Sequence, residues 1–234
     1  MLQPKHLVGS LLLPLLIQAA GIGFSIPLNI TEKERISYSD YRLDSATYTY
    51  KPSTGLGFVF DTNVGKDRDF SYRLNLEYSL AEIDSSSRLY SDSYSKHKYS
   101  IVNTFGFSLY HNRYIRLWVG PRINLQIEHA SSSTNIRHYN SYGIGFAAAA
   151  GLNIRLTSKM ALGVDIDYHG LRMLGGESYR DYDGATIGDT TYYTVLTGSN
   201  KGTTARFYFL VKFGEQYEQN KASTHTPSII DPTL

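Results

Sequence analysis

The segment FSYRLNLEYSLAEI, residues 70–83, decides the fold because its apolar and polar residues alternate at period two. One face carries Phe70, Tyr72, Leu74, Leu76, Tyr78 and Leu80, and the other carries Ser71, Arg73, Asn75, Glu77, Ser79 and Ala81. A β-strand separates two such sets onto opposite faces, whereas a helix scatters them around its axis. Alternation alone does not tell whether the apolar face covers a soluble core or faces lipid.

Six further segments are predicted as strands of the same kind, at residues 47–62, 96–110, 114–128, 141–155, 160–173 and 201–213. Because bacterial membrane barrels have an even number of strands, we expect an eighth strand upstream. Phe24, Ile26, Leu28 and Ile30 alternate with more polar or turn-forming residues, which favours residues 24–30 for this strand. Residues 35–43 are the alternative.

The connections between these segments alternate between short turns and long loops. Short turns are expected at residues 63–69, 111–113 and 156–159, and long loops rich in Tyr, Ser and Asp at 84–95, 129–140 and 174–200. Outer-membrane barrels have short periplasmic turns and longer external loops, and their strands exceed the roughly 5 to 6 residues of soluble proteins. The predicted fold class is therefore all-β, an eight-stranded antiparallel up-and-down transmembrane β-barrel.

The N-terminus predicts export. Lys5 and His6 precede an apolar run at residues 7–17 and small residues at 19–21, a pattern typical of a signal peptide. We therefore expect a signal peptide at 1–20, a barrel at 21–213 and a polar periplasmic tail at 214–234. The formal net charge of +2 gives no reason to expect nucleic acid as a partner, and the 20 tyrosines suit a membrane interface or exposed loops.

The predicted inward faces carry charges of both signs. The cations are Arg73, Arg116, Arg122, Arg155, Arg206 and Lys212, and the anions are Asp61, Glu77, Glu128, Asp165 and Asp167. An unpaired buried charge costs several kcal/mol, so these groups are expected to pair and to plug the lumen. The predicted lumen charge network comprises Arg73, Glu77, Arg116, Arg122, Glu128, Asp165, Asp167, His169 and Arg206. Long arginines are expected to occupy the space beside the small residues Gly143, Gly145, Ala147, Ala149 and Gly151.

Asp165, Asp167 and His169 also share one face, which would suit a metal or an acid–base site. We interpret the two carboxylates instead as counter-ions of the arginines and predict neither a metal nor a cofactor. No G-x-S-x-G nucleophile motif occurs, so no catalytic residue is predicted.

Three segments resemble a known group of proteins: GLGFVFD at 55–61, YRLNL at 72–76 and the closing run FYFLVKF at 207–213. They resemble the small eight-stranded outer-membrane barrels, the group of the OmpA transmembrane domain, OmpX and OmpW and the broad "porin family". The resemblance implies location in the outer membrane of a Gram-negative cell, insertion by the barrel-insertion machinery, and contact with outer-membrane lipid and lipopolysaccharide. The closing run departs from the usual terminal signal, because Tyr208 stands where glycine is usual and residues follow Phe213.

Members of this group act as adhesins, stabilisers, small channels and, rarely, lipid-modifying enzymes, and fold does not choose among these roles. The first hypothesis is a non-enzymatic barrel whose loops, above all residues 174–200, contact an extracellular ligand or stabilise the envelope. A narrow channel for small or apolar solutes and a lipid A-modifying hydrolase are the alternatives.

Overall fold

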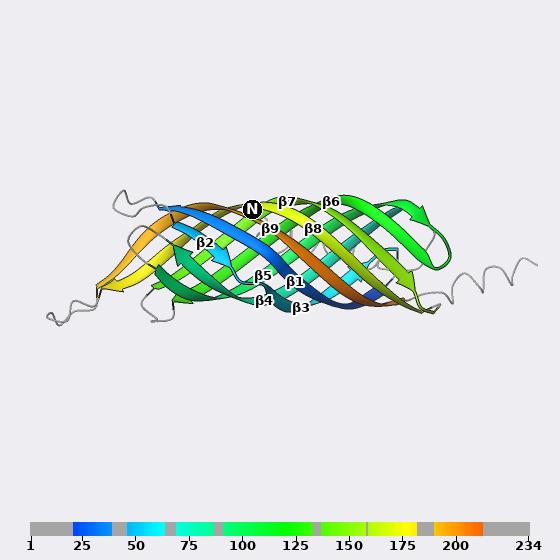
Figure 1. Ribbon diagram of the computed structural model, residues 1–234, viewed down its shortest axis with the longest axis horizontal. Helices are drawn as coiled ribbons and strands as arrows, with labels where there is room; N and C mark the ends of the chain where they lie inside the picture. The colour runs from blue at the N-terminus through cyan, green and yellow to red at the C-terminus, as the bar shows by residue number, and fades with distance from the viewer. Residues whose placement is uncertain are drawn as a thin grey trace, which may run out of the picture.

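The computed structural model is a closed antiparallel β-barrel whose strands tilt around its long axis (Figure 1). It describes residues 21–38, 46–63, 69–86, 91–132, 137–157, 159–181 and 190–212. The strands are β1 (Gly21–Tyr38), β2 (Ala46–Tyr50), β3 (Ser53–Asp61), β4 (Phe70–Ser86), β5 (Ser91–His111), β6 (Ile115–Ser132), β7 (Arg137–Arg155), β8 (Met160–Asp181) and β9 (Thr190–Lys212). The predicted signal peptide, the tail and Phe213 lie outside the described residues.

The ring has eight strand positions, as predicted. β1 pairs with β9 and so closes the barrel, while β2 and β3 both lie between β1 and β4. β2 and β3 are therefore two pieces of one strand, interrupted at Lys51 and Pro52. Proline lacks the backbone donor that a continuous ladder needs, which explains the interruption. β1 contains the favoured first strand at 24–30 and also the beginning of the alternative at 35–43.

β1 contains a bulge that changes which side chains face the lumen. Its register with β9 shifts between Asn29 and Thr31. Odd-numbered residues such as Asn29 are buried before the shift, and the even-numbered residues Glu32, Glu34 and Ile36 are buried after it. An extra residue in one strand breaks the strict alternation of faces. Without the bulge, continued alternation would place the carboxylates of Glu32 and Glu34 on the lipid side. The bulge places both of them in the lumen.

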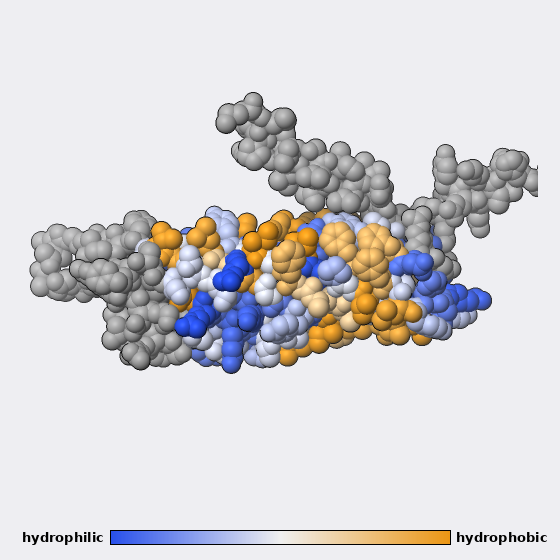
Figure 2. Space-filling view, turned by 90° about the horizontal axis from the view of Figure 1, so that it is seen from above, coloured by the Kyte–Doolittle hydropathy of each residue, from blue (hydrophilic) through white to orange (hydrophobic). Residues whose placement is uncertain are grey.

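The outer surface carries a belt of exposed apolar side chains. It includes Phe24, Phe58, Leu76, Leu125, Phe146, Ile166 and Phe207. Exposed aromatic rings edge the belt, with Tyr78, Tyr99, Tyr142 and Tyr168 at one end and Phe70, Phe107, Tyr110 and Tyr114 at the other. On the face in Figure 2, hydrophobic residues gather mainly over the middle of the barrel. Such a belt, with aromatic girdles, is typical of a barrel that faces lipid.

Tyr72 and Leu74 keep the predicted outward facing, because they alternate with the lumen residue Arg73 in an unbroken register, although both side chains are buried. One expectation about the tyrosines needs correction. The tyrosines are not confined to the interface and loops, because Tyr48, Tyr94 and Tyr139 lie buried inside the barrel. Within the described residues, no helix is long and apolar enough to cross a membrane.

The long loops predicted at 84–95, 129–140 and 174–200 are wrong in extent. Most of these residues continue the ladders of β4–β5, β6–β7 and β8–β9 beyond the apolar belt. Outside the membrane, the outward face of a strand meets water, so it need not be apolar. The alternation that marked the strands therefore fades there, and strand extensions resemble polar loops in the sequence.

The lumen is polar at belt level and apolar where the strands extend beyond it. Ile36, Tyr48, Tyr50, Ala81, Ile83, Tyr94, Ala130, Tyr139 and Leu196 form a buried cluster there. A smaller cluster of Val59, Ala161, Tyr208 and Leu210 lies near the opposite end. The predicted charged interior therefore describes the belt level of the lumen and not its two ends.

Candidate functional site

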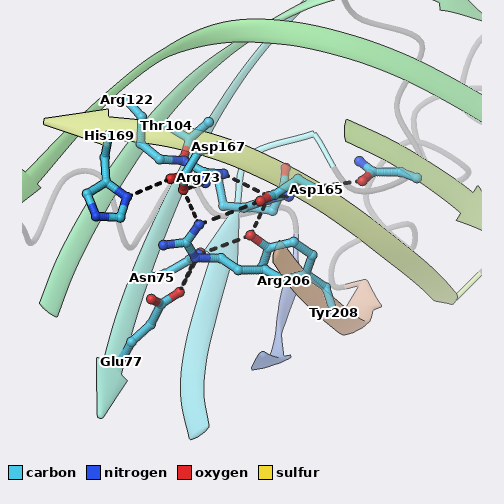
Figure 3. Close-up of polar contacts among 12 residues, drawn as sticks. Arg73, Asn75, Glu77, Thr104, Arg122, Asp165, Asp167, His169, Arg206 and Tyr208 are labelled. Atoms are coloured by element: carbon cyan, nitrogen blue, oxygen red, sulfur yellow. Dashed lines mark hydrogen bonds and ion pairs between the residues drawn. The ribbon is translucent and has the colours of Figure 1, made fainter. Parts of the chain in front are cut away.

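The charged network at the centre of the lumen is organised around Asp165 and Asp167 of β8 (Figure 3). Arg122 of β6 reaches both carboxylates, with 2.7 Å from Nη2 to Asp165 Oδ2 and 2.5 Å from Nη1 to Asp167 Oδ2. Its Nε donates to Thr104 Oγ1 at 2.7 Å. Arg122 is fully buried, so its charge is compensated entirely by protein groups.

Two further arginines enter the same network from other strands. Arg73 of β4 lies 2.7 Å from Asp61 and 3.4 Å from Asp165, and its guanidinium stacks 4.4 Å from the ring centre of Tyr208. Arg206 of β9 donates from Nε to Glu77 Oε1 at 2.7 Å and pairs with Asp167 as well. The network therefore links strands from around the barrel through shared carboxylates.

His169 lies at the edge of this network. Its Nδ1 is 3.1 Å from Asp167 Oδ1, while its buried Nε2 has no hydrogen-bond partner among the described residues. The Oδ2 atoms of Asp165 and Asp167 accept hydrogen bonds from arginines, which is the counter-ion arrangement. Among the described residues, no group of three His, Asp or Glu side chains is arranged to hold a metal ion.

A second charged cluster lies closer to the extended ends of the strands. Lys96 of β5 pairs with Glu34 at 2.9 Å and also with Glu128 of β6. Lys98 pairs with Glu32 at 2.8 Å. Glu128 thus belongs to a different cluster from the other predicted network residues.

Sequence reasoning missed four residues of this second cluster: Glu32, Glu34, Lys96 and Lys98. The two glutamates face inward only because of the bulge in β1. The two lysines face inward and alternate with His97 and Tyr99, which face outward. Extending the alternation of β5 toward its N-terminal end would therefore have placed both lysines in the lumen.

Arg116 is the predicted network residue that the structure leaves apart. It is buried, and its Nε donates to Ser108 Oγ at 2.6 Å. Within the part of the chain that the structure describes, its two terminal nitrogens have no hydrogen-bond partner. Arg155 and Lys212 lie near the same end of the barrel and are only partly buried.

The small residues of β7 are not all covered by arginines, which corrects one expectation. A Cβ at Gly151 would come within 2.6 Å of Trp118, and one at Gly143 within 2.4 Å of the Met173 sulfur. Trp118 and Met173 therefore fill the space beside these glycines. Large side chains from β6 and β8 close the lumen here together with the ion pairs.

One serine–histidine contact bears on the hydrolase alternative. Ser131 Oγ and His138 Nδ1 lie 2.9 Å apart on the outward face of β6 and β7. In the part of the chain that the structure describes, no carboxylate pairs with His138, so the group that orients the base in a catalytic triad is missing. The contact alone does not make a nucleophile.

Comparison with solved structures identifies the architecture. OprG from Pseudomonas aeruginosa, an outer membrane protein, matches with a TM-score of 0.54 at 12% identity, over 83% of this chain and 97% of that chain. The fold is that of an outer-membrane β-barrel. At this identity the likeness establishes the fold and says nothing of the activity.

Two other outer-membrane barrels align over a similar length at lower TM-scores. They are the protease OmpT from Escherichia coli, with 9% identity, coverage of 82% and 97%, and a TM-score of 0.44, and Neisserial surface protein A, with 16%, 81% and 97%, and 0.33. No protein-family model matches the chain, and comparison with curated proteins gave no match. The apolar belt and the barrel fold together place this chain in the bacterial outer membrane.

Proposed function

We propose that this outer-membrane barrel is non-enzymatic and does not conduct solutes, and that it acts through the part that extends from the membrane. The observation that carries the proposal is the two-level plug. Its first level is the charged network around Arg122 at the centre of the lumen. Its second level is the charged cluster around Lys96, with the apolar cluster beyond it. Its role would be contact with a surface ligand or support of the envelope.

The plug argues against the channel alternative. An eight-stranded barrel is just wide enough for its interior side chains to fill it. Arg122, Lys96, Glu34 and Glu128 are fully buried, and each takes part in an ion pair. A solute passing through would have to separate these pairs, and leaving one of these buried charges without its partner costs several kcal/mol.

The β8–β9 hairpin supports a role outside the membrane. Its ladder continues from Gly175↔Leu196 to Asp181↔Thr190, well beyond the apolar belt. In Figure 1 the yellow and orange strands of this hairpin project past the other strands at one end. A rigid two-stranded projection offers a defined surface to a partner, which a long flexible loop would not.

Conductance in planar bilayers tests the plug. The reconstituted full-length barrel is expected to carry no steady current, because two levels of paired side chains block the lumen. Insertion is verified by heat-modifiable gel mobility of the same preparation, and an open porin serves as the positive control. A steady current from the correctly folded protein would contradict the plug and favour a narrow channel.

Shortening the hairpin tests the external role. Replacing residues 176–195 by Asn-Gly joins the paired residues Gly175 and Leu196 with a two-residue turn and leaves the belt and plug intact. The variant is expected to fold, but cells producing it should match cells without the protein in autoaggregation and detergent resistance. Behaviour identical to the wild type in both assays would contradict the proposal.

A further inference from the structure

Four cations gather on the outer face just beyond the apolar belt. Lys33 and Arg35 lie on β1, Lys201 on β9 and Arg172 on β8, and all four are exposed. Lys33 lies directly opposite Lys201, and Ser199 lies directly opposite both Arg35 and Arg172. Directly opposite side chains have Cβ atoms about 5 Å apart, so this cation cluster is compact.

The cation cluster has no counter-ion within the residues that the structure describes. On the outer face, two described ion pairs join Lys51, in the interruption between β2 and β3, to Glu82 and Asp84 of β4 instead. The outward neighbours of the cluster on β1 and β9 are the neutral residues Thr31, Ser37, Thr197 and Thr203. Like charges directly opposite each other destabilise a sheet, so this arrangement favours an external anion.

An apolar groove begins directly below the cation cluster. It has a volume of about 620 Å³ and is lined by Val119, Ala148, Ala150, Ile166, Tyr168 and Thr203, among others. Thr203 is the next outward residue of β9 after Lys201. Between the two, Gly170 lies opposite Lys201, and a Cβ there would meet nothing within 4 Å. The groove and the cations therefore form one continuous surface.

We propose that this surface binds one phosphorylated lipid of the outer leaflet, with its phosphate on the cation cluster and an acyl chain in the groove. Cations at the level of the headgroups attract anionic lipids, while the groove offers an apolar wall. The cluster lies on the side of the belt where the strands extend outward, which faces the glycolipid leaflet of an outer membrane. The lipid is therefore the phosphorylated glycolipid lipid A. The inference rests on the outward orientation in the proposed function and is independent of the plug.

Native mass spectrometry of the full-length barrel in detergent tests the proposal. The probes are diphosphoryl lipid A, its dephosphorylated form and phosphatidylglycerol. The wild type is expected to retain diphosphoryl lipid A preferentially. K33Q/K201Q should weaken this binding by roughly 30-fold, since each cation beside an anionic lipid surface raises the affinity by about a factor of five. Ala148→Leu, which narrows the groove without changing charge, should weaken it as well.

The matched control removes two exposed cations at the opposite end, Arg113 and Lys159, in R113Q/K159Q, and should bind like the wild type. K33Q/K201Q is expected to fold at least as well as the wild type, because it removes a like-charge pair, and heat-modifiable mobility verifies this. Unchanged binding by K33Q/K201Q would overturn the site. Equal retention of dephosphorylated lipid A or of phosphatidylglycerol by the wild type would overturn the choice of ligand. A conducting barrel that still binds lipid A selectively would contradict the plug alone.

Discussion

Replacing Arg122 by alanine is expected to lower the free energy of unfolding by about 3–5 kcal/mol, the cost of removing one partner from a buried ion pair. The substitution removes the arginine that donates to both Asp165 and Asp167 and leaves Thr104 Oγ1 without its donor. Arg73 and Arg206 keep their ion pairs with these carboxylates, so the network loses one of its three cations. The substitution also opens a cavity at belt level. Urea unfolding measures the change, and Trp118, the only tryptophan and a lumen residue, reports it by fluorescence.

Arg116→Ala is the matched control for this prediction. Arg116 is a buried arginine on the same strand, β6, but its terminal nitrogens have no hydrogen-bond partner among the described residues. Its removal costs one hydrogen bond to Ser108, about 1 kcal/mol, and removes a buried charge that has no ion pair with a described residue. Equal losses of stability in the two variants would mean that side-chain volume, and not ion pairing, holds the lumen together.

Deleting Thr31 is expected to remove the bulge and leave the barrel able to fold. Ile30 and Thr31 both lie on the outer face, and Thr31 pairs with Thr203 of β9 while Ile30 is the extra residue. Without Thr31, Ile30 takes the place opposite Thr203, so Asn29 and Glu32 keep their partners on β9. Glu32 and Glu34 therefore stay in the lumen beside Lys98 and Lys96. On the other side of β1, the interruption between β2 and β3 absorbs the change of one residue. Heat-modifiable gel mobility after refolding measures the outcome.

Thr31→Ala is the control, because it keeps the number of residues and removes only an exposed side chain. Its unfolding free energy should change by no more than about 0.5 kcal/mol, as for most surface substitutions. A deletion variant that fails to refold, beside a T31A variant that refolds normally, would contradict the prediction and show that the extra residue of β1 is itself required for closure.

The predicted barrel and the central network share a physical basis. β4, β6, β8 and β9 alternate strictly through the belt, so the facing of Arg73, Arg122, Asp165 and Arg206 follows from position alone. Lipid contact requires the outward residues to be apolar. The sequence therefore shows which residues of each strand face outward and which face the lumen. The sequence could not tell which carboxylate each arginine contacts, because that depends on neighbours far apart in the chain.

The outer half of the molecule was predicted less well. There both the water-facing side of a strand and a loop are polar, so the strand extensions at 174–181 and 190–200 were mistaken for a loop. The lumen is apolar in this region, opposite to the rule that holds at belt level. Tyr48 and Tyr139 were accordingly not recognised as interior residues.

The sequence by itself determined that this chain forms an eight-stranded membrane barrel with a charged interior, since each strand must separate lipid from lumen at every second residue. Only the tertiary structure decided the rest. The bulge in β1 turns Glu32 and Glu34 into the lumen, and closure of β1 on β9 brings Lys33 opposite Lys201. Both depend on register between strands at opposite ends of the chain, and one residue of register reverses the facing of every side chain that follows.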